Sequence, residues 1–276
     1  MSVKKGADLN REKITISTLR AKKSAGERVV MVTATDYSLA RIVDDAGVDI
    51  VLVGDSLAQV ALGFDNTLPV TMDEMLVFTR AVARGVRRAL VVADMPFLSY
   101  QVSAEEARRN AGRFLKEGGA AAVKLEGGAE VAATVASIVA MGVPVLGHVG
   151  LTPQSVHAMG GYRVQGRDEQ RARGIIDGAR ALEEAGAFGV VLEGMPRRLA
   201  ASITATLGVP TIGIGAGPEC SGQVLVLHDL LGLWGGHRPK FAKRYATCGD
   251  EAGRAVRQFC DEVRGGLFPD EEHSFD

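Results

Sequence analysis

The chain has 276 residues, 46% of them hydrophobic, which suits one large globular core of about the usual size of an α/β barrel. Its 32 basic and 33 acidic residues give a formal net charge of -1, so nothing in the charge favours nucleic acid or an anionic membrane surface, and a small-molecule ligand fits better. No apolar run approaches the roughly 20 residues needed to cross a bilayer, and the first residues lack the apolar region of a signal peptide, so we expect a cytoplasmic protein.

A repeated unit follows, in which an amphipathic segment and a glycine precede a short apolar run. In chain order these runs lie at 28–34, 46–55, 89–96, 118–126, 141–148, 185–193, 207–215 and 223–229. Continuous Val, Ile and Leu are typical of strands that are covered on both faces. Helices are expected between them, best seen at 103–117, where Ser103 and Glu106 form a possible capping box and Gly118 ends the helix.

Eight strands that alternate with helices favour a (βα)8 TIM barrel. An open doubly wound sheet is the alternative, although no Gly-x-Gly-x-x-Gly motif follows the first strand. We expect a single domain over 1–276, with an N-terminal extension to about residue 27 and a polar tail from about 244 to 276 that packs outside the barrel or frays. The three cysteines are widely separated and odd in number, which indicates ordinary free thiols: Cys220, Cys248 and Cys260.

Acidic residues stand at the ends of four predicted strands: Asp55, Asp94, Glu126 and Glu193. The carboxyl ends of barrel strands converge on one face, where active sites are built. Acids from three consecutive strands would repel one another, and a bound cation would remove that conflict. Oxygen ligands without a Cys or His cluster favour Mg²⁺, with Mn²⁺ or Co²⁺ as substitutes. The alternative is that each acid caps the helix or turn that follows its strand.

Other polar residues lie at the same predicted face. Lys124 and Glu126 are two apart on a strand, so both side chains point into the barrel, either as a structural ion pair or with Lys124 holding a substrate carboxylate or keto oxygen. Ser56 could donate to that carboxylate or stabilise a turn. His148 ends the fifth strand and is either a hydrogen-bonded core histidine or a residue that handles protons.

The GIGAG glycines and the remaining histidines are weaker indications of a ligand site. The glycines of GIGAG at 213–217 could hold a phosphate, but a tight turn explains them as well. The remaining histidines show no spacing that is typical of metal ligands: His157, His228, His237 and His273.

At these same residues the chain resembles the ketopantoate hydroxymethyltransferase family. The resemblance rests on VGDSLA (53–58), TLPVTMDEM (67–75), ADMPFLSY (93–100), VKLEGG (123–128), GHVGLTPQSV (147–156), GGYRVQGR (160–167), VVLEGMP (190–196), IGIGAGPECSGQVLVLHDLLGL (212–233) and HRPKFAKRY (237–245). These stretches occur in order from about Thr33 to Tyr245 without large gaps, which makes the set highly specific.

The resemblance implies a barrel enzyme that uses Mg²⁺ to transfer a hydroxymethyl group from 5,10-methylenetetrahydrofolate to 3-methyl-2-oxobutanoate. The product is 2-dehydropantoate (ketopantoate), made in pantothenate biosynthesis through a Mg-stabilised enolate. The family's functional residues fall on seven positions. The metal-site acids fall on Asp55, Asp94 and Glu126. The substrate-binding residues fall on Ser56 and Lys124 and, in addition to their metal role, on Asp55 and Asp94; an active-site histidine falls on His148 and a proton acceptor on Glu193. A homodecamer is implied as well.

One position departs from the family pattern, and two other functions compete. Thr35 stands where the family often has tyrosine next to the keto acid, so one substrate contact is in doubt. A metal-dependent lyase of the phosphoenolpyruvate mutase and isocitrate lyase type would use the same carboxylates but lacks the GHVGLTPQS and GGYRVQGR stretches. A metabolite-binding barrel without catalysis is the second alternative.

Overall fold

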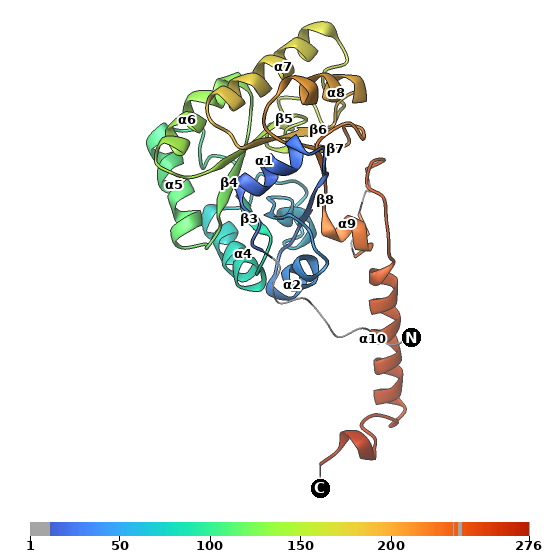
Figure 1. Cartoon of the computed structure of the whole chain (residues 1–276). Helices are drawn as coiled ribbons and strands as arrows, with labels where there is room; N and C mark the ends of the chain where they lie inside the picture. Colours follow the sequence, from blue (N-terminus) through green and yellow to red (C-terminus); the bar gives the residue numbers. More distant parts are fainter. Residues whose placement is uncertain (1–11, 234, 237–238, 276) are drawn as a thin grey trace. The chain divides into compact units, whose positions relative to one another are not determined.

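A computed structural model describes residues 12–233, 235–236 and 239–275, and its centre is a closed barrel of eight parallel strands (Figure 1). The strands are β1 (Val29–Thr33), β2 (Ile50–Val53), β3 (Leu90–Asp94), β4 (Ala122–Glu126), β5 (Val145–Gly150), β6 (Gly189–Glu193), β7 (Thr211–Ile214) and β8 (Gly222–Leu225). Each strand pairs with the next along the chain, and β8 pairs with β1. The predicted barrel is confirmed, and the open-sheet alternative is wrong.

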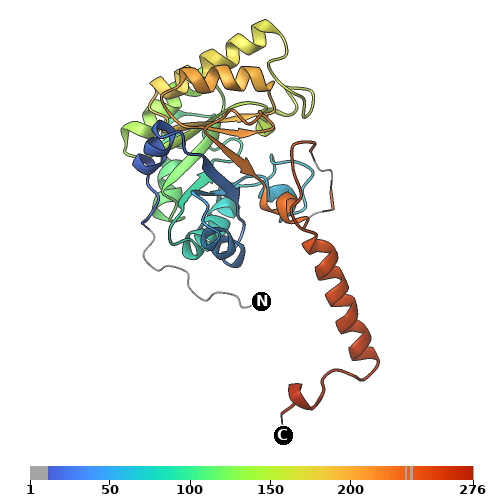
Figure 2. The same cartoon turned by 45° about the vertical axis from the view of Figure 1, so that its right-hand side comes forward.

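Helices surround the barrel in the predicted alternation: α2 (Tyr37–Asp45), α3 (Leu57–Val60), α4 (Met72–Gly85), α5 (Ala104–Lys116), α6 (Ala132–Ala140), α7 (Glu169–Glu184) and α8 (Arg197–Thr206). At the start of α5 the Ser103 side chain accepts a hydrogen bond from the Glu106 amide, which is one half of the expected capping box; the return contact from the Glu106 side chain is not formed. Its buried face includes Ala107, Ala111 and Phe114. Helices α7 and α8 lie side by side outside the barrel (Figure 1, Figure 2).

Side-chain alternation divides the barrel interior into an apolar end and a polar end. On β3, Leu90 and Val92 belong to the central core cluster, and Asp94 lies two residues further on the same face. On β4, Ala122 belongs to the core and is followed on its face by Lys124 and Glu126. The same inward rows that build the core therefore end in charged groups at the carboxyl ends of the strands.

The segment before β1 closes the amino end of the barrel rather than extending from it. Helix α1 (Ile16–Ser24) lies across that end (Figure 1). Ile14 and Leu19 are buried in the same core cluster as the inward strand residues. Lys22 pairs with the buried Asp49 at 2.9 Å, and Asp49 also accepts a hydrogen bond from the Val30 amide at 2.9 Å. Within the predicted N-terminal extension, Ile14 and Leu19 thus belong to the barrel core, and Ile16 packs against it.

The chain divides into two compact units, one ending at Leu225 and the other beginning at Val226. The second unit contains α9 (Leu227–Leu231), α10 (Cys248–Arg264) and a short 3-10 helix, η3 (Glu271–His273). The predicted tail is helical over most of its length, and the single-domain organisation stays a prediction. Among the described residues, no helix is both long and apolar enough to cross a membrane.

Asp44 on α2 organises the loop that leads into β3. Its carboxylate is buried and accepts hydrogen bonds from three consecutive backbone amides, those of Arg87, Arg88 and Ala89, at 2.7–3.3 Å. Hydrogen bonds to a charged group are stronger than neutral ones, and a buried amide that loses its acceptor costs about 1–3 kcal/mol.

We therefore expect Asp44→Ala to lower the free energy of unfolding by about 3 kcal/mol, since one buried and two partly buried amides lose their acceptor together. Urea titrations of variant and parent at the same protein concentration measure the change. Asp45→Ala is the matched control, because the neighbouring Asp45 is exposed and its ion pair with Arg41 spans 3.9 Å. Equal stability of the two variants would contradict this role for Asp44.

Candidate active site

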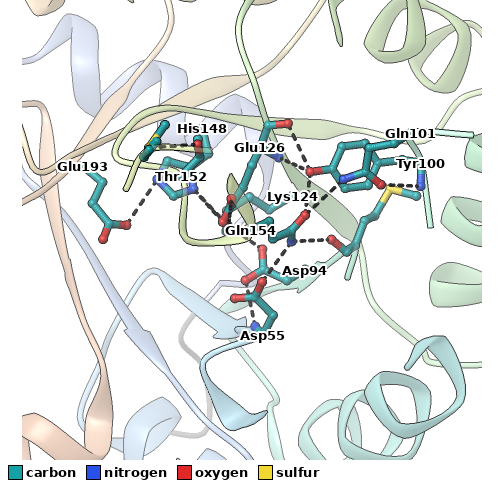
Figure 3. A network of polar contacts seen from close by, with 12 residues as sticks. Asp55, Asp94, Tyr100, Gln101, Lys124, Glu126, His148, Thr152, Gln154 and Glu193 are labelled. Atoms are coloured by element: carbon teal, nitrogen blue, oxygen red, sulfur yellow. Dashed lines mark hydrogen bonds and ion pairs between the residues drawn. The ribbon is translucent and has the colours of Figure 1, made fainter. Parts of the chain in front are cut away.

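Charged and polar side chains from five strand ends meet at the carboxyl end of the barrel (Figure 3). Asp94, Lys124, Glu126 and Glu193 lie on β3, β4 and β6, His148 lies on β5, and Asp55 follows β2. Gly150 ends β5 with a φ of 99°, and a Cβ there would collide with the carbonyl oxygen of Glu193, so this glycine allows β5 and β6 to approach closely. The structure brings together six of the seven predicted residues in one polar network.

Lys124 pairs with Asp94, and not with Glu126 as the ion-pair alternative supposed. The Lys124 ammonium lies 2.7 Å from Oδ1 of Asp94, and both side chains are buried. The register places these two residues directly opposite each other on β3 and β4. The other carboxylate oxygen of Asp94, Oδ2, accepts a hydrogen bond from the Asp55 amide at 3.0 Å. This pairing ties β2, β3 and β4 together at the site.

His148 lies between two carboxylates. Its Nδ1 is 3.5 Å from Oε1 of Glu126 and its Nε2 is 3.2 Å from Oε2 of Glu193. Nδ1 also lies 3.3 Å from the Lys124 ammonium. His148 is the fourth residue of β5 rather than the last, because the strand continues to Gly150, but its side chain still reaches the site.

Burial and charge shift the pKa values of this network in opposite directions. Burial, followed by the charges of Asp94 and Glu126, raises the pKa of Asp55 to about 8. Burial also raises the pKa of Asp94, against the opposing effect of Lys124. For Lys124, burial alone would lower the pKa, but the surrounding carboxylates together raise it. The site therefore holds carboxyl groups that repel one another and a lysine that remains charged.

The pKa values of His148 and Glu126 are shifted in the directions that favour the charged form of each side chain. Burial and the nearby Lys124 would lower the pKa of His148, but contacts with Glu126 and Glu193 raise it to about 9. Burial opposes ionisation of Glu126, yet its contacts with His148 and Lys124 and the Gln154 amide lower its pKa overall. At neutral pH we therefore expect an imidazolium held between two carboxylates.

Two residues that the sequence reasoning missed complete the network. The Gln154 side chain donates from Nε2 to Oδ2 of Asp55 at 2.9 Å, and its backbone amide donates to Oε2 of Glu126 at 3.0 Å. The Tyr100 hydroxyl lies 2.7 Å from Oε1 of Gln154. Both residues lie within stretches that carry the family resemblance, ADMPFLSY and GHVGLTPQSV, and that position was the only signal for them.

The donor set fits a divalent cation, although the side chains are not arranged around one as they stand. Within the described ranges, no three His, Cys, Asp or Glu side chains converge closely enough to hold a metal ion. However, Oε1 of Glu126 is buried and accepts no hydrogen bond from the described residues. Asp55 and Asp94 are adjacent buried carboxyl groups whose mutual repulsion a cation would relieve. Oxygen ligands of this kind suit Mg²⁺.

The remaining predicted positions are Ser56, Thr35 and the glycines of GIGAG. Ser56 directly precedes α3, and its side chain makes no capping hydrogen bond there. Thr35 is buried, with its hydroxyl 3.5 Å from Oδ2 of Asp36. In GIGAG, Gly215 and Gly217 have φ values of 61° and 88°, as a tight turn requires.

In the part of the chain that the structure describes, no cysteine takes part in the contacts of this network. All three cysteines are free, as predicted. His273 pairs with Asp270 on η3 at 2.6 Å. His237 lies outside the described residues.

Solved structures with the same fold come from several enzymes. A phosphonopyruvate hydrolase complex with oxalate and Mg²⁺ superposes with a TM-score of 0.61 at 16% identity, covering 94% of this chain and 92% of that one. Phosphoenolpyruvate phosphomutase from Streptomyces platensis subsp. rosaceus gives a TM-score of 0.59 at 19% identity, covering 95% and 92%. At such low identity these likenesses establish the barrel fold alone.

Sequence comparison is more specific. The family model for ketopantoate hydroxymethyltransferase matches residues 13–271. A 3-methyl-2-oxobutanoate hydroxymethyltransferase from Geobacter metallireducens is 56% identical over 267 residues, covering 97% of this chain and 100% of the relative. The protein of that name from Pelobacter propionicus is 58% identical over 265 residues, covering 96% and 98%. The chain therefore belongs to the ketopantoate hydroxymethyltransferase family.

Proposed function

We propose that the chain transfers a hydroxymethyl group from 5,10-methylenetetrahydrofolate to 3-methyl-2-oxobutanoate and forms ketopantoate for pantothenate biosynthesis. The observation that carries the proposal is the family match over nearly the whole chain, joined to a buried network of carboxylates, lysine and histidine at the carboxyl end of the barrel. No feature of the site favours the lyase or the metabolite-binding alternative, since the likeness to mutases and lyases is one of fold alone.

The keto acid brings a carboxylate and a keto oxygen, and Lys124 is the cation placed to receive one of them. Its ammonium is buried, is held by Asp94 at 2.7 Å, and remains charged because the surrounding carboxylates raise its pKa. In a buried site, a charged hydrogen bond of this kind contributes more than it would in water. Ser56, next to Asp55, would contribute a hydroxyl donor to the same substrate.

Asp55, Asp94 and Glu126 would hold one divalent cation, directly or through water, and Mg²⁺ suits their oxygen atoms, with Mn²⁺ or Co²⁺ as substitutes. When bound, such a cation supplies electrostatic stabilisation of the negative charge that develops on the keto oxygen. Asp94 then has two roles, since it also holds the Lys124 ammonium in place.

Glu193 is the residue we assign to remove the proton from C3 of the keto acid. It ends its own strand, and its side chain is 15% exposed, whereas the Glu126 side chain is 3% exposed, so it lies toward the opening where substrate enters. His148 lies 3.2 Å from Oε2 of Glu193 and would orient that carboxylate. The enolate carbon would attack the one-carbon unit of the folate, so a carbon–carbon bond forms while the carbon–nitrogen bonds to the folate break. Water supplies the hydroxyl group of the product. Its remaining proton and the proton taken from C3 pass to the two folate nitrogens, and tetrahydrofolate leaves.

A cavity of about 540 Å³ adjoins the network beside Glu126. Tyr100, Gln154 and Arg171 are among its lining residues, together with the backbone of Gly127 and Gly128. This volume lies within the range of small-molecule sites. We assign it to the folate co-substrate, whose reactive carbon has to come close to the keto acid.

Self-association and location complete the proposal. A homodecamer is expected from the family, and helix α10 supports association because Val256, Phe259 and Val263 are exposed along one face. Neither nucleic acid nor a membrane is proposed as a partner. The cytoplasmic location expected from the sequence stays a prediction.

We expect Asp94→Asn to weaken Mg²⁺ binding at least tenfold, because the change removes a full negative charge from the cation site. Isothermal titration of the full chain with Mg²⁺ measures the affinity. Asp73→Asn is the control, since Asp73 lies on the exposed start of α4 and pairs only with Arg113 in the described part of the chain. Unchanged affinity in Asp94→Asn would remove this residue from the cation site.

Lys124→Ala is expected to raise the dissociation constant for 3-methyl-2-oxobutanoate at least tenfold, equivalent to about 1.4 kcal/mol, because the substrate carboxylate or keto oxygen loses its cationic partner. Equilibrium binding in the presence of Mg²⁺ measures it, and the melting temperature shows that the variant is folded. Lys116→Ala, at an exposed position of α5, should bind as the parent does. A change below about twofold in Lys124→Ala would make the lysine structural.

Glu193→Gln keeps the shape of the side chain and removes the basic oxygen, so it tests both the base and the reaction. We expect near-normal Mg²⁺ and keto-acid affinity, with exchange of the C3 proton in D₂O and hydroxymethyl transfer both reduced about 10²–10⁴-fold. NMR follows the exchange with and without tetrahydrofolate. Glu184→Gln, on the exposed face of α7, is the matched control.

The same measurements of proton exchange and hydroxymethyl transfer, made on the parent chain, test the proposed function itself. Absence of exchange and of ketopantoate formation in the parent would contradict the function itself. Exchange near the parent rate in Glu193→Gln would instead move the base elsewhere, to His148 or to water at the cation.

A further inference from the structure

Gln154 contacts two of the proposed cation ligands at once, although the proposed reaction gives it no role. It lies in the 3-10 turn η2 (Pro153–Ser155), which follows β5, and only 6% of the residue is exposed. Because Gln154 lies at the start of this turn, its backbone amide has no acceptor inside the turn. A buried amide side chain has to satisfy both of its donors and its acceptor, so its contacts indicate what it does.

The side chain and the backbone of Gln154 each hold one carboxylate. Nε2 donates to Oδ2 of Asp55 at 2.9 Å and to the carbonyl of Met95 at 3.0 Å, which uses both amide hydrogens. The backbone amide donates to Oε2 of Glu126 at 3.0 Å. One oxygen of each carboxylate is therefore occupied by Gln154. Among the described residues, Oε1 of Glu126 accepts no hydrogen bond of good geometry and faces Nδ1 of His148 at 3.5 Å.

Tyr100 determines which way the amide faces. Its hydroxyl accepts a hydrogen bond from the Glu126 amide at 3.2 Å and donates its single hydrogen at 2.7 Å to Oε1 of Gln154, the shorter of its two acceptor contacts. If the amide were reversed, its oxygen would face two acceptors, on Asp55 and Met95, and its nitrogen would face the donated hydrogen (Figure 3). The Tyr100 hydroxyl thus holds the donor side of Gln154 against Asp55.

We propose that Gln154 is a positioning residue that selects which oxygen of Asp55 and of Glu126 remains available to the divalent cation, and that Tyr100 sets its orientation. The inference rests on the proposed function, because it concerns the ligands of the proposed cation. Without the amide, the buried Asp55 carboxyl would lose its donor and could turn away from the orientation that the cation requires. The backbone contact to Glu126 would remain.

The test compares Gln154→Met, which keeps the length of the side chain and removes its hydrogen bonds, with Tyr100→Phe, which removes the hydroxyl alone. Isothermal titration of the full chain with Mg²⁺ is the primary measurement, and the melting temperature of each metal-free variant is the folding check. Gln59→Met is the matched control, because the Gln59 amide donates to the Asp65 carbonyl at 3.1 Å and not to a carboxylate of the site.

We expect Mg²⁺ affinity to fall at least tenfold in Gln154→Met, at least threefold in Tyr100→Phe, and less than twofold in Gln59→Met. Turnover of Gln154→Met should recover as Mg²⁺ is raised, since a displaced ligand weakens binding, whereas a loss of folded enzyme lowers turnover at every Mg²⁺ concentration. Affinity within twofold of the parent in a folded Gln154→Met would overturn the proposal. If that variant does not fold, unchanged affinity in Tyr100→Phe overturns it.

These outcomes are distinct from a failure of the proposed function. A parent chain that binds Mg²⁺ weakly or not at all would contradict the cation site itself. A loss of affinity confined to the variants concerns Gln154 and Tyr100 alone.

Discussion

The need to neutralise buried charge is the constraint on which the carboxyl end of this barrel depends. Asp55, Asp94, Lys124, Glu126 and His148 are each at most 5% exposed. An unpaired charge at such depth costs several kcal/mol, so opposite charges have to lie close together. Lys124 lies beside Asp94, and His148 lies between Glu126 and Glu193. Each member is held by its neighbours and in turn limits where they can lie.

The surplus of carboxyl groups in this network has a chemical consequence. Lys124 and His148 cannot balance Asp55, Asp94, Glu126 and Glu193 completely, and burial raises the pKa of Asp55 to about 8. A divalent cation and an α-keto acid together would bring both the missing positive charge and a ligand for the lysine. Under the proposed function, binding of the metal and the anionic substrate would relieve the charge imbalance that makes this site costly.

At the amino end of the barrel, the buried side chains stabilise the fold. There Ile14 and Leu19 fill the apolar interior, and the buried acids Asp44 and Asp49 accept hydrogen bonds from backbone amides. Such contacts stabilise the fold without leaving a charge available for chemistry, which is the usual division between the two ends of this architecture. The barrel itself is shared with hydrolases, mutases and lyases, so the chemistry belongs to the side chains at one end.

Eight apolar runs that alternate with helical patterns were enough to predict the barrel, and the ends of these runs placed Asp94, Glu126 and Glu193 at strand ends. Period two along β4 also predicted that Lys124 and Glu126 point to the same side. The tertiary structure decided which groups meet: the parallel register sets Lys124 opposite Asp94, and Glu126 opposite His148. Gln154 and Tyr100 lie in a turn and a loop and follow no period, so only the closure of the barrel reveals that they reach the carboxylates. Register and loop position arise from contacts between segments far apart in the chain, and no local pattern encodes them.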